Sequence, residues 1–278
     1  MTFARKNEII VTVDLGAKTA YDVRGCIYCL QFVRVLEIPK MNLHRIAINI
    51  AEVREKIHRA TERSGRTANS VKLIAVSKYA TKDDGIIDAM IAAGCCDFGE
   101  SRPQILVEKA LHFSEQKSNI NWHLIGSLQR NKVRKILPHT ALLHSLDSVA
   151  LIEAIDRIAD EESLPPVSGL LEVNISGDET KQGFQPQELA AALDGIGTLR
   201  NIRICGLMCM SGLHSTDGER RAEFATTRQL AEKMAGNCPE NCVLQELSMG
   251  MSDDFEMAIE EGATLVRVGS SLYKDVLF

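Results

Sequence analysis

The clearest pattern along the chain is a series of short apolar runs separated by longer amphipathic stretches. Most of these runs are almost continuously hydrophobic, which is typical of strands that are covered on both faces. We count eight of them, at residues 72–78, 96–101, 121–128, 142–147, 169–176, 203–210, 246–252 and 264–273. The pattern predicts eight buried strands.

Helical periodicity occupies the intervals between the runs. A first helix is expected between Asn42, a plausible N-cap, and Gly65, a stop signal, because isoleucine and valine recur there at helical spacing. Further helices are predicted around residues 151–160, 186–196, 217–236 and 255–261, the last one after a Ser252 cap.

Strict alternation of strands and helices implies parallel pairing through right-handed crossovers. Eight such units predict an α/β fold, a closed (β/α)8 TIM barrel, formed by residues 42–278 as a single domain with an extra N-terminal helix. An open doubly wound sheet is the alternative, but the first strand is not followed by the glycine-rich turn of that fold.

The first 41 residues look foreign to this domain. We interpret them as a poorly ordered N-terminal extension or a misassigned start, because an ordinary domain could begin at Met41. Cys26 and Cys29 form a lone C-x-x-C within this segment, a weak zinc signal without a second pair. Cys205 and Cys209 lie in an apolar run and are expected to be small buried hydrophobes.

Composition narrows the class of partner. The formal net charge is −5, so no overall basic field would attract nucleic acid or an anionic membrane. The basic run at 129–135 is expected to be a solvated helix start, and no apolar stretch is long enough to span a bilayer. Without a convincing signal peptide we expect a cytoplasmic protein, and we expect a monomer.

Candidate chemistry gathers where the predicted strands end, because the carboxyl ends of barrel strands form the active face. Lys78 ends the first strand. The last two strands end in loops rich in glycine and serine, a composition suited to binding phosphate, and they supply Ser248, Gly250, Gly269 and Ser270. A phosphate site opposite a lysine suggests pyridoxal 5'-phosphate (PLP), bound as a Schiff base to Lys78.

Arg267 alternates with Gly269 and should face the same side. A guanidinium only donates hydrogen bonds, so at the pyridine nitrogen it would keep that nitrogen unprotonated and the ring a poor electron sink. His123 and Met210 are expected at the same face.

Each of these residues also has a structural interpretation that the sequence leaves open. Lys78 could be a surface lysine at a strand end, and Arg267 a salt-bridged strand residue. The S-M-G-M-S segment, residues 248–252, could be turn chemistry before a helix, and His123 could be a satisfied core histidine.

Four motifs together resemble the YggS/PROSC family of pyridoxal phosphate homeostasis proteins. The resemblance covers about residues 42–273, and the motifs are L-I-A-V-S-K ending at Lys78, W-H-L-I-G-S-L-Q-R-N-K at 122–132, S-M-G-M-S-D-D at 248–254 and R-V-G-S at 267–270. It implies a barrel like the N-terminal domain of alanine racemase. It also implies PLP on Lys78, phosphate contacts at Ser248, Gly269 and Ser270, and Arg267 near the pyridine nitrogen.

The same resemblance implies a role in binding, buffering or delivering PLP, without robust turnover, and apo PLP-dependent enzymes as candidate partners. Lys132 and Lys181 match lysines that the family carries near or outside the site. Ser101 departs from the family, which has an asparagine beside the cofactor; serine is shorter and lacks the amide donors. Ser127 replaces a proline.

An amino-acid racemase is the competing interpretation. A two-base racemase needs an acid–base group on each face of its substrate. Alanine racemases that resemble this barrel take the second base, a tyrosine, from another domain, for which we see no room before Phe278. Tyr79 adjoins Lys78 and should point away from it by strand alternation. These points favour a carrier, with no metal site.

Overall fold

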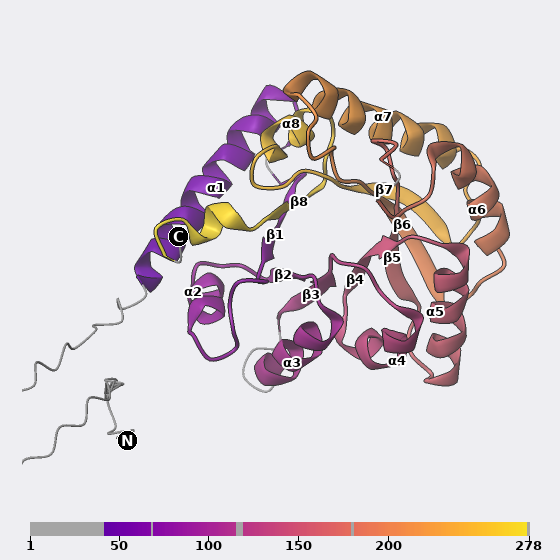
Figure 1. The fold of residues 1–278 in the computed structure, drawn as a ribbon, viewed down its shortest axis with the longest axis horizontal. Coiled ribbons are helices and arrows are strands. Elements are labelled where there is room, and N and C mark those ends of the chain that lie inside the picture. Colours follow the sequence, from indigo (N-terminus) through magenta and orange to yellow (C-terminus); the bar gives the residue numbers. More distant parts are fainter. Residues whose placement is uncertain (1–41, 68, 115–118, 179–180, 277–278) are drawn as a thin grey trace, which may run out of the picture. The chain divides into compact units, whose positions relative to one another are not determined.

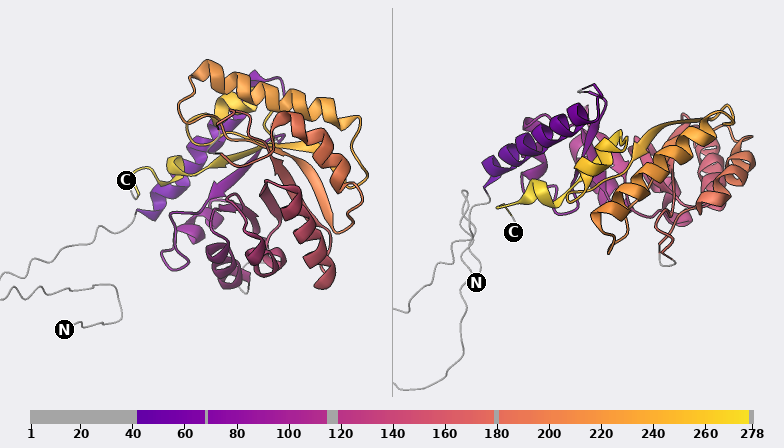
Figure 2. Two further views of the ribbon diagram at one scale, coloured as in Figure 1. Left: turned by 45° about the vertical axis from the view of Figure 1, so that its right-hand side comes forward. Right: turned by 90° about the horizontal axis from the view of Figure 1, so that it is seen from above.

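The structure is a computed structural model and describes residues 42–67, 69–114, 119–178 and 181–276. The expected extension at 1–41 and its Cys26–Cys29 pair lie outside these residues. Eight parallel strands form a closed barrel in the order β1 to β8, and the helices surround them (Figures 1 and 2). The predicted (β/α)8 barrel is therefore confirmed.

Each of the eight predicted apolar runs overlaps a strand. The strands are β1 (Lys72–Val76), β2 (Asp97–Glu100), β3 (Asn121–Leu124), β4 (Leu142–Leu146), β5 (Val167–Glu172), β6 (Ile202–Met208), β7 (Cys242–Ser248) and β8 (Leu265–Val268). β5, β6 and β7 begin before the runs that predicted them. Most strands end earlier than predicted, so several residues expected at strand ends lie in the following loops.

The α-helices are α1 (Leu43–Arg63), α2 (Ile86–Ala92), α3 (Pro103–Ser114), α4 (Val133–Ile136), α5 (Val149–Glu161), α6 (Leu189–Ile196), α7 (Asp217–Ala235) and α8 (Phe255–Glu260). Four 3₁₀ segments accompany them: η1 (Arg130–Lys132), η2 (Leu137–His139), η3 (Pro186–Glu188) and η4 (Ser270–Tyr273). The basic run predicted as a solvated helix start forms η1 and α4.

Helix α1 packs outside the barrel against the segment that follows β8 (Figure 1). Its predicted cap is confirmed, because the Asn42 side chain accepts a hydrogen bond from Arg45 N. The buried Asn49 amide donates to the Leu272 and Lys274 carbonyls at 3.0 and 2.8 Å. These bonds fasten η4 and Lys274, which follow β8, to α1.

The barrel interior has an apolar part and a polar part. Ile74, Leu170, Met208 and Leu265 form a buried apolar cluster from β1, β5, β6 and β8. A string of buried polar side chains runs across the rest of the interior: His123 from β3, His144 from β4, Ser248 from β7 and Arg267 from β8. Buried polar groups require partners, and in this protein they bond to one another.

In the part of the chain that the structure describes, no helix has both the length and the apolar composition needed to cross a bilayer.

Candidate functional site

Lys78 lies in a turn at the carboxyl-terminal rim of the barrel. β1 ends at Val76, and Ala80 N donates to Ser77 O at 2.9 Å, so Lys78 and Tyr79 are the central residues of a turn. The Lys78 side chain is exposed, and its Nζ lies 4.9 Å from the centre of the Tyr79 ring. We expected Tyr79 to point away from Lys78 by strand alternation. This was wrong, because β1 ends at Val76 and both residues lie beyond it.

A buried ion pair holds the start of this turn. Lys109 of α3 is 2% exposed, and its Nζ donates to a Glu100 carboxylate oxygen at 2.5 Å and to the Ser77 carbonyl at 2.8 Å. The other Glu100 oxygen accepts from Ser101 N at 2.9 Å. One buried pair therefore fixes the ends of both β1 and β2.

Arg267 is a buried cation held by neutral acceptors. Its Nη1 donates to the carbonyl and the hydroxyl of Ser248 at 2.7 and 2.5 Å, and its Nη2 donates to the Cys209 carbonyl at 2.9 Å. A guanidinium has five N–H groups, so two remain without a partner among the described residues. No carboxylate of those residues lies within ion-pair distance of it, which excludes the salt-bridge interpretation for this part of the chain.

Burial at 4% exposure lowers the pKa of Arg267, although the charges of Cys209, Asp254 and Glu172 oppose that shift. An arginine remains protonated regardless. The side chain is thus a fixed positive charge beneath the rim, with spare donors and no neutralising partner in the described chain. An anion or a hydrogen-bond acceptor at this position would be stabilised.

The loops after β7 and β8 meet at the hydroxyl of Ser252. Gly269 N and Ser271 N donate to Ser252 Oγ at 3.1 and 3.4 Å. Ser252 was expected to cap the next helix, but the residue at that position is Asp254. Backbone N–H groups that converge in this way can bind an anion in proteins. In this structure both donate to Ser252 Oγ.

The two glycines of these loops differ. Gly250 has φ +90°, and a Cβ there would come within 2.8 Å of the Phe255 backbone, so packing requires glycine. A Cβ at Gly269 would meet Val76 at an ordinary 3.4 Å. Protein packing alone does not demand glycine at 269, so its lack of a side chain leaves space at the rim. Ser270 is exposed beside it.

Ser248 and His123 lie deeper than the sequence suggested. Ser248 is fully buried, and its hydroxyl contacts Arg267 and His144 rather than the rim loops. Both ring nitrogens of His123 have protein partners, His144 at 3.0 Å and Asp97 at 3.1 Å. This favours the core-histidine interpretation of His123. Direct ligand contacts by these two residues stay predictions.

Ser101 and Met210 lie on the rim loops after β2 and β6. The loops after β2 and β3 touch closely, because a Cβ on Gly126 would come within 2.2 Å of Ser101 O. Met210 packs on the apolar cluster of the interior. Lys181 Nζ donates to the carbonyls of Met210 and Ser211 at 3.3 and 2.8 Å, so it fastens the loop after β6.

Glu172, which the sequence reasoning missed, ends β5 inside the barrel. It is 6% exposed, and burial together with the Asp147 charge raises its pKa to about 7, against the opposing charges of Arg267 and Lys181. Its signal in the sequence was an acidic residue inside the apolar run 169–173. A protonated carboxyl can donate as well as accept.

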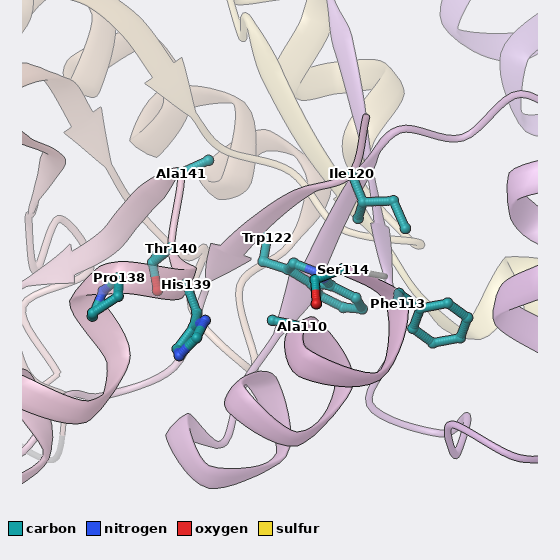
Figure 3. Close-up of a pocket in the computed structure, with 9 residues that line it drawn as sticks. All are labelled: Ala110, Phe113, Ser114, Ile120, Trp122, Pro138, His139, Thr140 and Ala141. Carbon is teal, nitrogen blue, oxygen red and sulfur yellow. The ribbon is translucent and has the colours of Figure 1, made fainter. Parts of the chain in front are cut away.

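Two cavities of the described residues lie away from this rim. One of about 350 Å³ is bordered by the end of α3, the start of β3 and η2, with Trp122 and Phe113 among its lining residues (Figure 3). Another of about 440 Å³ lies at the amino-terminal ends of β1 and β2 and includes Arg54, Lys72 and Asp97. Neither is lined by a predicted site residue. Within the described residues no cluster of three or more metal-ligating side chains occurs.

Comparison with known proteins gives one consistent match. The model of the family described as alanine racemase, N-terminal domain, matches residues 42–276. The chain is 41% identical over 211 residues to the pyridoxal phosphate homeostasis protein of Synechocystis sp., which covers 75% of this chain and 93% of that protein. It is 36% identical over 232 residues to the protein of the same name from Escherichia coli K12, with coverage of 83% and 97%.

Solved structures agree. PipY of Synechococcus elongatus with PLP bound is 36% identical and superposes with a TM-score of 0.71, over 82% of this chain and 99% of PipY. Alanine racemase of Corynebacterium glutamicum has a TM-score of 0.56 at 17% identity, over 83% of this chain and 60% of the racemase. The racemase likeness shows the fold alone.

Proposed function

Because this chain belongs to the family of pyridoxal phosphate homeostasis proteins, we propose that it binds PLP at the carboxyl-terminal rim of its barrel and acts in intracellular PLP homeostasis. The observation that carries the proposal is Arg267, a buried cation with two spare N–H donors and no carboxylate partner among the described residues. The relative PipY has been solved with PLP bound.

The residues at the rim fit the cofactor. PLP has an anionic phosphate, a pyridine nitrogen that accepts a hydrogen bond, and an aldehyde. The Gly269 and Ser271 N–H groups and the Ser252 and Ser270 hydroxyls suit the phosphate. Arg267 supplies donors for the ring nitrogen, and Met210 supplies apolar surface.

We assign the covalent anchor to Lys78. When bound, PLP supplies an aldehyde carbon that joins an amine with loss of water. Lys78 is the exposed lysine in the turn after β1, and β1 is the hydrogen-bonded neighbour of β8, which carries Arg267. Lys181, by contrast, has its amine committed to two carbonyls.

We propose a carrier without robust turnover rather than a racemase. A two-base racemase needs acid–base groups on opposite faces of the substrate. Tyr79 contacts Lys78 and therefore lies on the side of the lysine, while the Tyr273 hydroxyl is buried and donates to Val76 O at 3.0 Å. An assay of α-proton exchange from alanine in heavy water tests this; exchange at ordinary enzyme rates would contradict it.

The binding proposal is tested by titrating the purified protein with PLP and with pyridoxal, which lacks the phosphate, and following absorbance. We expect PLP to bind at least tenfold more tightly than pyridoxal, because the loops after β7 and β8 donate hydrogen bonds to the phosphate that pyridoxal lacks. Equal affinity for both would contradict the assigned phosphate site. We also propose that the protein transfers PLP to apo PLP-dependent enzymes, is a monomer and lies in the cytoplasm. Light scattering tests the monomeric state.

A further inference from the structure

A continuous chain of hydrogen bonds crosses the barrel interior from the start of β2 to Arg267. Asp97 Oδ1 contacts His123 Nε2 at 3.1 Å, and His123 Nδ1 contacts His144 Nε2 at 3.0 Å. His144 Nδ1 then contacts Ser248 Oγ at 2.8 Å, and that hydroxyl accepts from Arg267 at 2.5 Å. We refer to these five residues as the relay.

The two ends of the relay determine the direction of every proton in it. Arg267 can only donate, and an ionised Asp97 can only accept. If the rings are neutral, the Ser248 hydroxyl donates to His144 Nδ1, His144 Nε2–H donates to His123 Nδ1, and His123 Nε2–H donates to Asp97. The opposite order would place the bare Nε2 of His123 against a carboxylate oxygen.

The electrostatics of the relay agree with this order. The hydrogen bond from His123 and the charge of Lys72 lower the pKa of Asp97, although burial alone would raise it, so the carboxylate is ionised. Burial foremost, and then the Arg267 charge, lower the pKa of His144 well below its usual value, and a positive charge on His123 would lower it further. A neutral His144 is what the order requires.

The charged and polar groups around the relay are few. At the Asp97 end, Lys72 Nζ lies 3.7 Å from Oδ1, and Asn121 Nδ2 donates to the same oxygen at 3.1 Å. Asp97 retains some exposure, its side chain being 14% exposed, and borders the cavity at the amino-terminal ends of the strands. His144 is fully buried between β3 and β7.

We propose that Asp97, His123 and His144 are positioning residues that act on the PLP site through Ser248 and Arg267. His144 accepts a hydrogen bond from the Ser248 hydroxyl, and this turns the lone pairs of the hydroxyl oxygen toward Arg267. The guanidinium is then held only by acceptors, so its plane and its two remaining N–H donors keep one orientation. The carboxylate at the far end of the barrel fixes this orientation. The effect on cofactor binding rests on the proposed function; the orientation of the relay does not.

The orientation is tested in the protein without added PLP. Nitrogen-15 NMR of histidine-labelled protein distinguishes protonated from bare ring nitrogens. We expect His123 and His144 both to carry their proton on Nε2 at neutral pH, with assignment by His123→Gln and His144→Gln. A proton on His144 Nδ1, or an imidazolium at His123, would overturn the proposal.

Asp97→Asn removes the carboxylate, which can only accept hydrogen bonds and so sets the direction of the relay, and it keeps the shape of the side chain. An asparagine can accept from His123 through its oxygen or donate to it through its amide. We therefore expect signals of both tautomers in Asp97→Asn. Asp156→Asn is the control, because Asp156 is likewise a half-buried aspartate that accepts hydrogen bonds, from Arg200 N and Asn201 N, but it does not touch the relay. Unchanged tautomers in Asp97→Asn would contradict the assigned role of Asp97.

The link to the cofactor is tested by PLP affinity. We expect Asp97→Asn and Ser248→Ala to weaken PLP binding about five- to tenfold, Ser248→Thr to recover much of the loss by restoring the hydroxyl, and Asp156→Asn to bind like the wild type. Wild-type affinity in Asp97→Asn and Ser248→Ala would overturn the positioning role. If the wild type itself did not bind PLP, the proposed function would fail, while the NMR result would still decide the orientation.

Discussion

Lys78 and Arg267 are the two cations of the candidate site, and they have opposite surroundings. Lys78 follows β1, and Arg267 lies on the neighbouring strand β8. Lys78 is exposed in a turn, and its Nζ lies 4.9 Å from the centre of the Tyr79 ring. Arg267 is 4% exposed and is held by three hydrogen bonds to fixed acceptors. A group that must form and break a covalent bond needs access, whereas a group that orients a ligand must not move. The difference predicts that variants of the two will fail in different ways.

Lys109→Met should give the largest effect, because it removes the buried support behind the turn of Lys78. Glu100 would then keep a buried charge without its partner, and we expect the free energy of unfolding to fall by about 3–5 kcal/mol in urea titrations.

The double variant Glu100→Gln with Lys109→Met serves as the control for Lys109→Met. It removes both charges, so we expect it to be more stable than Lys109→Met alone. A loss below about 1 kcal/mol in Lys109→Met would show that the pair does not anchor the turn.

Glu172 tests the surroundings of Arg267, because the Arg267 charge is one of the charges that act on the pKa of Glu172. Its pKa of about 7 in the folded protein lies above the reference value of 4.5. A raised pKa contributes stability that is complete below the unfolded value and is lost as the pH rises through about 7.

Between pH 4.5 and above 7, the wild type should therefore lose about 2–3 kcal/mol relative to Glu172→Gln. Urea titrations across this range measure the difference, with the exposed Glu55→Gln as a comparison variant. If the difference in free energy of unfolding between the wild type and Glu172→Gln stayed constant with pH, the pKa of Glu172 would not be raised.

Arg267→Lys keeps the charge but loses the planar fork that reaches several acceptors at once. We expect PLP affinity to fall about tenfold, or about 1.4 kcal/mol, measured by absorbance titration. Native affinity in Arg267→Lys would show that charge alone matters and that fixed orientation does not.

Lys78→Ala should have the smallest effect on folding. The side chain is exposed and makes no buried bond, so the free energy of unfolding should stay within about 0.5 kcal/mol of the wild type. Thermal and urea unfolding check this, and a loss above about 2 kcal/mol would mean that Lys78 has a structural role.

Much of the fold could be predicted because it depends on local patterns. Parallel barrel strands are apolar on both faces, so β1, β5 and β6 were visible as apolar runs. The rim residues followed from the rule that barrel sites lie at strand ends. Alternation predicted Arg267 and Gly269 on one side; because β8 ends at Val268, this stays a prediction for Gly269.

The remaining features depend on which strands meet and where each one stops. Lys109 lies on an ordinary helix, and only the packing of α3 on β2 brings it to Glu100. His144 joins His123 to Ser248 because β3, β4 and β7 converge in the interior. Tyr79 was misplaced because β1 ends at Val76. A sequence pattern carries no information about such contacts between distant segments.

The most direct test of the central claim is borohydride reduction of the protein incubated with PLP, followed by peptide mass spectrometry. We expect one reduced pyridoxyl phosphate group on the peptide containing Lys78, and its loss in a folded Lys78→Ala variant. An adduct on Lys181 or Lys132 that persists in Lys78→Ala, or no adduct in the wild type, would contradict it.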